Sequence, residues 1–166
     1  MVKAADLQQL SHSLWLWQAF DPAVKSDLFS SAARSAEQLF LIDPIPLETP
    51  AMEELDTQGQ VAGILVTNVN HRRAAGMFAR KYDVTIFSAA EVACEFSGLR
   101  TAALNADDTR EFGAIPIPGA AAGETAFHFP ADGGTIVVGD ALINLEPYGF
   151  ALLPVKYCRE IGRAHV

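Results

Sequence analysis

The chain has 166 residues, half of them hydrophobic, so it can bury one sizeable core, and its length predicts a single domain. Twelve basic residues against twenty acidic ones give a net charge of -8. This balance argues against nucleic acid as the main partner, because that affinity depends on clustered Lys and Arg. The sequence has neither the apolar run of a signal peptide nor the roughly 18 apolar residues of a membrane span. We therefore expect a cytoplasmic protein that does not bind membranes.

The first half of the chain predicts three strands and then alternating helices and strands. Apolar runs bounded by polar residues predict an antiparallel meander at residues 13–19, 28–33 and 38–42. A helix is expected from Thr49, which suits an N-cap, because Pro50 fits the first helical turn. The elements expected next are a buried strand, an amphipathic helix, a second strand and a short helix capped by Ser88, at residues 61–66, 71–82, 84–87 and 88–94. This order predicts parallel strands with covered faces.

The second half of the chain returns to strands. They are expected at residues 111–117, 125–129 and 135–138. The turn Ala131-Asp132-Gly133-Gly134 joins the last two and is a strong hairpin signal. Strands on both sides of the helical segment predict two packed sheets with helices on the outside.

A polar loop follows the buried strand at residues 61–66. It reads Thr67-Asn68-Val69-Asn70-His71-Arg72-Arg73-Ala74-Ala75-Gly76. The side-chain oxygen of Asn68 or Asn70 can cap the helix that comes next. His71 is the sole imidazole of the loop, and we expect either an exposed or helix-capping residue or a general base.

Four motifs in chain order resemble those of the metallo-β-lactamase fold superfamily. They are Leu41-Ile42-Asp43-Pro44, the strand that ends at Thr67, Pro118-Gly119-x-x-x-Gly123, and Gly139-Asp140-Ala141-Leu142. The resemblance spans roughly residues 14–157, nearly the whole chain. It implies an α/β (α+β) fold, an αββα sandwich with a metal site at one edge between the sheets, and it agrees with the order of strands and helices.

The resemblance also shows which metal ligands this chain lacks. Members bind two metal ions through Thr-His-x-His-x-Asp-His, a His after Pro-Gly, the Asp of Gly-Asp and a final His on a late strand. The matching positions before that final His hold Asn68, Asn70, Arg72, Arg73, Ala120 and Asp140. Amide oxygens are weak zinc ligands. An Arg about 4 Å from a cation costs roughly 4 kcal/mol per pair of unit charges at an effective dielectric near 20. No metal cofactor is therefore expected, with Asp140 the one retained ligand position.

Two functions are compatible with this pattern. The first is a relative that has lost the dinuclear site and hydrolase activity and has a binding or regulatory role. Its pocket would be formed by Asn68, Asn70, His71, Arg72, Arg73, Ala120 and Asp140. Arg73 or Arg72 is predicted to pair with Asp140, because a buried charge needs a partner, and the same pocket could hold a small anion. The alternative is an esterase-, lactonase- or thioesterase-like hydrolase in which Asp140, His71 and the final His hold zinc or iron.

The C-terminal end departs from the superfamily pattern. The resemblance fades after Leu153-Pro154-Val155-Lys156-Tyr157, before the final His, so the sandwich is expected to be incomplete there. Residues 161–166 match the translation of a common sequencing adapter and are expected to be non-native. The domain is therefore predicted to cover residues 1–160.

Overall fold

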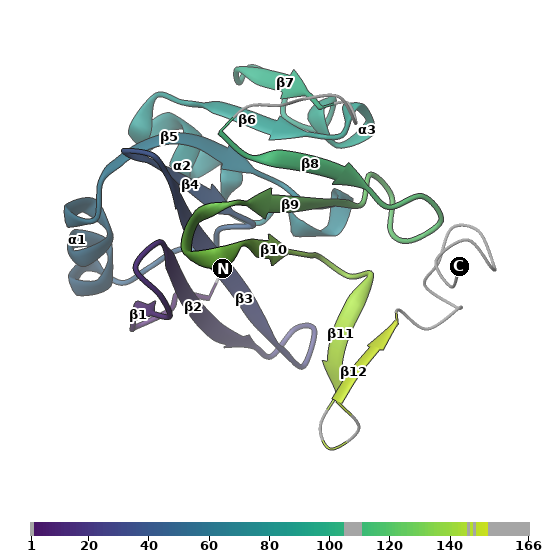
Figure 1. The fold of residues 1–166 in the computed structure, drawn as a ribbon, viewed down its shortest axis with the longest axis horizontal. Coiled ribbons are helices and arrows are strands. Elements are labelled where there is room, and N and C mark those ends of the chain that lie inside the picture. The colour runs from purple at the N-terminus through teal and green to yellow at the C-terminus, as the bar shows by residue number, and fades with distance from the viewer. Residues whose placement is uncertain (1, 105–110, 146, 148, 153–166) are drawn as a thin grey trace.

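The computed structural model describes residues 2–104, 111–145, 147 and 149–152. The predictions for the C-terminal end and for residues 161–166 concern residues outside these ranges. Two β-sheets face each other, and helices cover the outer face of the larger sheet (Figure 1). Among the described residues, no helix has the length and apolar character needed to cross a membrane.

The larger sheet has its strands in chain order. They are β1 (Gln8–Gln9), β2 (Leu14–Asp21), β3 (Ser26–Ser35), β4 (Gln38–Ile42), β5 (Gln60–Leu65), β6 (Thr85–Ser88) and β7 (Thr101–Ala103). The first four form an antiparallel meander, and β4 to β7 are parallel. The crossovers carry the helices α1 (Thr49–Thr57), α2 (Ala75–Tyr82) and α3 (Ala90–Ala93). Parallel strands need such crossovers, which is why the helices lie on one face.

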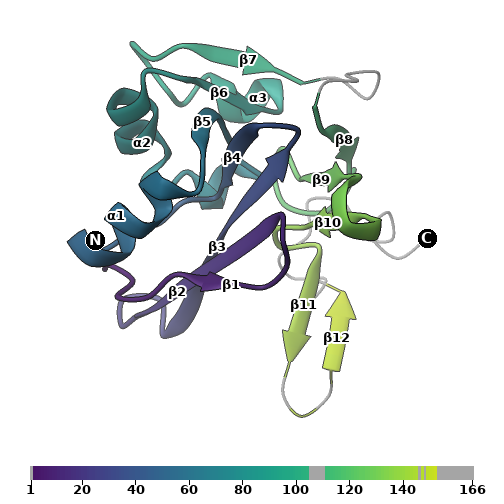
Figure 2. The same cartoon turned by 60° about the vertical axis from the view of Figure 1, so that its left-hand side comes forward.

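The second sheet is antiparallel and smaller. It contains β8 (Gly113–Pro116), β9 (Thr125–Phe129) and β10 (Thr135–Val137), with a 3-10 turn at Ala131–Gly133 between the last two. A hairpin of β11 (Leu142–Leu145) and β12 (Gly149–Leu152) follows and stands away from the body of the molecule (Figure 2).

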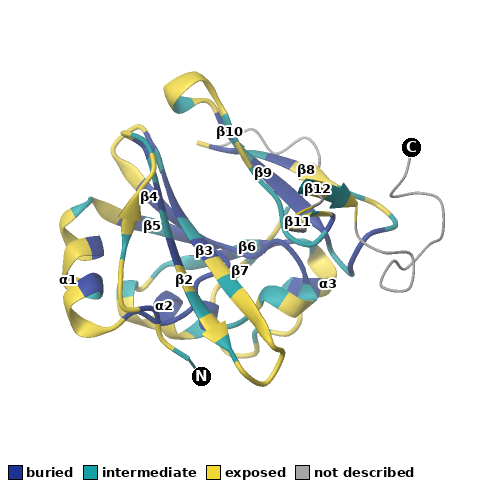
Figure 3. Cartoon of the chain, turned by 90° about the horizontal axis from the view of Figure 1, so that it is seen from below, coloured by how far each residue is buried: buried dark blue, intermediate teal, exposed yellow. Residues whose placement is uncertain are grey.

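Two apolar cores lie on opposite faces of the larger sheet, and β4 contributes to both. Leu39 and Leu41 pack into the core beneath the helices, whereas Phe40 and Ile42 pack between the sheets. Successive side chains of a strand point to opposite faces, so an entirely apolar strand is buried on both sides. Figure 3 shows the resulting buried band through the centre of both sheets. The C-terminal end of β4 is thereby held rigidly between two packed layers.

The expected strands at 13–19, 28–33, 38–42, 61–66, 84–87, 111–117, 125–129 and 135–138 all form, with small shifts at their ends. The side-chain caps expected at Thr49 and Ser88 were predicted wrongly. Thr49 is the first residue of α1, whose N-cap is Glu48, and Ser88 ends β6 while Ala89 precedes α3. The amphipathic helix begins at Ala75 instead of residue 71, because a separate 3-10 turn comes first.

Candidate functional site

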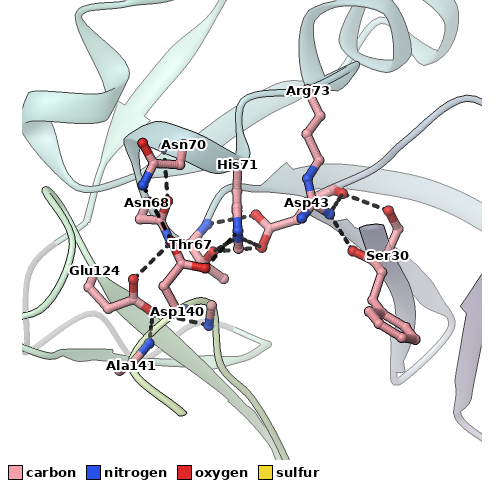
Figure 4. A network of polar contacts seen from close by, with 12 residues as sticks. Ser30, Asp43, Thr67, Asn68, Asn70, His71, Arg73, Glu124, Asp140 and Ala141 are labelled. Carbon is pink, nitrogen blue, oxygen red and sulfur yellow. Dashed lines mark hydrogen bonds and ion pairs between the residues drawn. The ribbon is translucent and has the colours of Figure 1, made fainter. Parts of the chain in front are cut away.

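Polar residues from four segments meet at one edge between the sheets (Figure 4). They come from the end of β4, the loop after β5, the residue before β9 and the segment after β10. Parallel strands end at a common edge of their sheet, so β4 and β5 place their following residues side by side. This cluster includes several of the positions selected from the sequence.

Asp43 connects the end of β4 to the start of the loop. Its carboxylate accepts hydrogen bonds from the backbone N–H of Thr67 (2.8 Å) and from the Thr67 hydroxyl (2.6 Å). Its backbone lies in the left-handed region at φ 48°, and Ser30 donates to its carbonyl at 2.7 Å. Asp tolerates this backbone conformation better than most residues do. Asp43 is therefore a buried anion with a fixed orientation.

His71 bridges two carboxylates. Its Nδ1 lies 2.8 Å from Asp43 Oδ2, and its Nε2 lies 3.0 Å from Asp140 Oδ1. Burial by itself lowers the pKa of His71, but the hydrogen bonds to Asp140 and Asp43 outweigh burial and raise the pKa to about 9. The ring is therefore an imidazolium at neutral pH, with both N–H groups donating. His71 is neither exposed nor a helix cap, which corrects the first expectation for it.

Glu124 is the third carboxylate of the cluster. Its Oε2 accepts from Asn68 Nδ2 at 2.8 Å, and its Oε1 accepts from the backbone N–H groups of Gly139 and Asp140, both at 3.0 Å. Burial raises the pKa of Glu124 to about 7, and the charge of Asp140 adds to this effect. All these partners are donors, so the ionised carboxylate is the form that fits them. Glu124 thus holds the loop after β5 against the segment after β10.

The two Asn side chains are committed to this framework. Asn68 Oδ1 accepts from the backbone N–H of Asn70 at 2.9 Å, so it caps the 3-10 turn Val69–His71 and not, as predicted, the helix α2, whose N-cap is Ala74. Asn70 Nδ2 donates to Asp140 Oδ2 at 3.4 Å. The opposite amide orientation of Asn68 would place its oxygen against the Glu124 carboxylate, so the assigned orientation is the consistent one.

The two Arg side chains do not pair with Asp140, and that prediction was wrong. Arg72 Nη1 forms an ion pair with Glu95 Oε2 at 2.7 Å. The guanidinium of Arg73 donates to the backbone carbonyls of Phe29 and Asp43. Because the backbone of Arg73 has φ 36°, its side chain leaves the loop toward β3. His71, which was assigned no fixed partner, supplies the positive charge beside Asp140.

The donor set at the superfamily's metal positions does not fit a dinuclear site. The oxygen of Asn68 is occupied by a backbone N–H, Ala120 is fully buried and has no donor atom, and Asp140 is held by His71. Arg73, whose charge acts on both Asp43 and Asp140, is a fixed cation that would repel a metal ion. Within the described ranges, no three His, Cys, Asp or Glu side chains are arranged to hold a metal ion.

Of the seven positions selected from the sequence, Asn68, Asn70, His71 and Asp140 join one network, whereas Arg72 points away from it. The loop also contacts the Pro-Gly segment, because the N–H of Val69 donates to the carbonyl of Ala122 at 3.0 Å. The sequence reasoning missed the roles of Asp43 and Glu124 in this network. An Asp directly after a buried strand could have indicated the role of Asp43, whereas nothing in the local sequence indicated the role of Glu124.

A helix layer packed on two facing sheets, with a polar cluster at one edge between them, defines the metallo-β-lactamase type of sandwich. A sequence profile described as the metallo-beta-lactamase superfamily matches residues 8–113. The chain therefore belongs to this superfamily, and the predicted fold class is confirmed.

Solved structures of the superfamily share this fold at low sequence identity. The DIM-1 metallo-beta-lactamase matches 87% of this chain and 74% of its own, with a TM-score of 0.67 at 10% identity. A metallo-beta-lactamase from Pontibacter korlensis matches 85% of this chain and 74% of its own, with a TM-score of 0.66 at 16% identity. A beta-lactamase domain protein from Burkholderia ambifaria covers 87% and 60%, with a TM-score of 0.63 at 15% identity. No protein with a curated description matches the sequence. At these identities the likeness establishes the fold and not the activity.

Proposed function

We propose that this chain is a metal-independent member of the superfamily with a binding or regulatory role in the cytoplasm, and not a hydrolase. One observation carries the proposal: both ring nitrogens of His71 are engaged by carboxylates, Asp43 on one side and Asp140 on the other. Asp140 occupies the ligand position that the chain retains, and the imidazolium of His71 balances its charge.

The chemistry of the cluster supports this reading. Hydrolysis in this superfamily depends on a metal ion that lowers the pKa of bound water to near neutrality. The imidazolium of His71 cannot accept a proton, so it cannot activate water in place of a metal. Asn68 and Glu124 close the cluster on the other side with a hydrogen bond of 2.8 Å. The groups here hydrogen-bond one another, and the ring of His71 lies between Asp43 and Asp140.

Metal content and turnover test the proposal together. We expect the purified chain, after dialysis against zinc or iron, to retain substoichiometric metal and to hydrolyse none of a set of ester, lactone and thioester substrates. The alternative function, a hydrolase with a reduced site, predicts one tightly bound metal ion and turnover that a chelator abolishes. It also predicts that Asp140→Asn loses both properties. Stoichiometric metal with Asp140-dependent turnover would overturn the proposal.

A further inference from the structure

A second concave site lies on the other side of the loop after β5, away from Asp140. This cavity has a volume of about 890 Å³ and is lined by the loop, the first turns of α2, the segment after α3 and the N-terminal segment. Asn70, Arg72 and Arg73 line it, so the loop contributes to both sites. His71 and Asp140 belong to the first site alone.

Positive charge is concentrated in this cavity although the chain is acidic overall. Four of the chain's twelve basic residues line it: Lys3, Arg72, Arg73 and Arg80. One acidic residue, Glu95, also lines it. In a chain of net charge -8, such a grouping creates a local field of the opposite sign that attracts anions.

Half of this charge has no carboxylate partner. Arg72 pairs with Glu95, and Arg73 lies within reach of the charges of Asp43 and Asp140, whereas Lys3 and Arg80 form no ion pair in the part of the chain that the structure describes. Arg73 donates to the backbone carbonyls of Phe29 and Asp43, and Arg80 donates to the carbonyl of Gly76 at 3.2 Å. The carbonyl of Gly76 is a neutral acceptor, which orients the guanidinium of Arg80 and leaves its charge available.

The cavity also has an apolar side. Met77 is 42% exposed, and together with Phe96 and Leu99 it lines the wall beside the cations. Phe96 and Leu99 are packed against the core beneath the helices, so this wall is fixed from behind. A ligand that fits both walls has an anionic group and an apolar body.

We propose that this cavity binds a small organic phosphate, with the phosphate group beside Arg80 and Lys3 and an apolar group against Met77. Guanidinium groups match phosphate oxygens with paired hydrogen bonds, and two cations without a carboxylate partner favour a dianion over a monoanion. This assignment rests on the binding role proposed above and names the ligand class.

Calorimetric titration of the full chain with phenyl phosphate in the presence of EDTA tests the assignment. We expect phenyl phosphate to bind at one site, and inorganic phosphate and phenol to bind much more weakly. Arg80→Gln and Lys3→Gln should each weaken phenyl phosphate binding by about tenfold, the loss expected for one charge-assisted contact. Lys25→Gln removes the same charge from the exposed β2–β3 turn and should leave the affinity unchanged.

Three outcomes would overturn the assignment. The first is that phenyl phosphate does not bind, and the second is that Arg80→Gln and Lys3→Gln both bind it as tightly as the wild type does. The third is that Lys25→Gln loses as much affinity as those variants, which would indicate a response to net charge alone. Thermal melts of each variant establish that it is folded before titration. EDTA keeps metals out of this experiment, and no turnover is measured. Failure here is thus distinct from failure of the metal-independent function, which metal content and hydrolysis decide.

Discussion

At the scale of single residues, the charge of a side chain balances the carboxylates of the cluster. His71 stands between Asp43 and Asp140 at hydrogen-bond distance from both, and Arg73 adds a second cation whose charge also lowers the pKa of Asp140. Three carboxylates at close range would repel one another without such cations. The imidazolium carries a single positive charge and is fixed to the chain between the two carboxylates.

This arrangement predicts a stability that falls in mildly alkaline solution. The pKa of His71 is raised from 6.5 in the unfolded chain to about 9 in the folded chain, so its stabilisation is complete below pH 6.5 and is lost as the pH rises through 9. Between pH 7 and 9.5 the free energy of unfolding should fall by about 2 kcal/mol. Glu124, with its pKa of about 7, contributes mainly below that window. Urea unfolding at several pH values measures the slope.

His71→Gln is the control for that slope. Glutamine can donate one hydrogen bond but carries no charge, so Asp43 and Asp140 would face each other with less compensation. The variant should lose about 3 kcal/mol at pH 7, and its stability should be nearly flat from pH 7 to 9.5. A variant that keeps the wild-type slope would show that another group produces it.

At the scale of elements, the loop after β5 and the segment after β10 are packed closely together. No local sequence pattern predicts these contacts. The strands themselves were predictable, since apolar alternation and turn residues are local signals. The start of α2 was not, because Asn68 diverts the chain into a 3-10 turn and Arg73 takes a left-handed backbone conformation. The partner of Asp140 was predicted wrongly for the same reason, as those backbone angles decide which side chain faces it.

Gly139 is where these two segments approach most closely, and Gly139→Ala should disrupt the cluster. A Cβ there would lie 2.5 Å from Thr67 Oγ1, 2.7 Å from Asn68 Nδ2 and 2.8 Å from Glu124 Oε1. Each of those atoms is held by its own hydrogen bonds, so relief requires breaking some of them. We expect a loss of roughly 1 to 3 kcal/mol in urea unfolding.

Gly113→Ala is the matched change on β8. The nearest atom to its added Cβ would be His128 Cβ at 3.6 Å, an ordinary contact. This variant should remain close to wild type. If Gly113→Ala and Gly139→Ala were equally destabilising, the effect would belong to glycine replacement in general and not to the close approach at the cluster.

At the scale of the whole molecule, the cluster depends on two sheets that are held at a fixed separation. The sequence predicted two packed sheets, and its apolar pattern identified β4 and β5 as buried strands. It did not predict β1, β7, β11 or β12, which are short or formed late in the chain with weak alternation. Nor did it single out Phe112, which lies within the strand expected at residues 111–117 and occupies the centre of the core between the sheets. Such a position is set by tertiary packing alone.

Phe112→Ala should therefore loosen the second sheet from the first. The Phe112 ring contacts those of Phe40 at 5.1 Å, Phe127 at 5.7 Å and Phe87 at 5.8 Å between centroids, so truncation leaves a cavity bordered by both sheets. The expected loss is about 3 to 5 kcal/mol, with hydrogen-exchange protection reduced first in β8, β9 and β10. Phe150→Ala removes an equal volume from a side chain that is 76% exposed and should change stability by less than about 0.5 kcal/mol.

Because Glu124 and Asp140 reach the cluster from the second sheet, loosening that sheet in Phe112→Ala should also lower the pKa of His71 toward 6.5. An unchanged His71 titration in a destabilised Phe112→Ala chain would show that the cluster holds together without the core between the sheets.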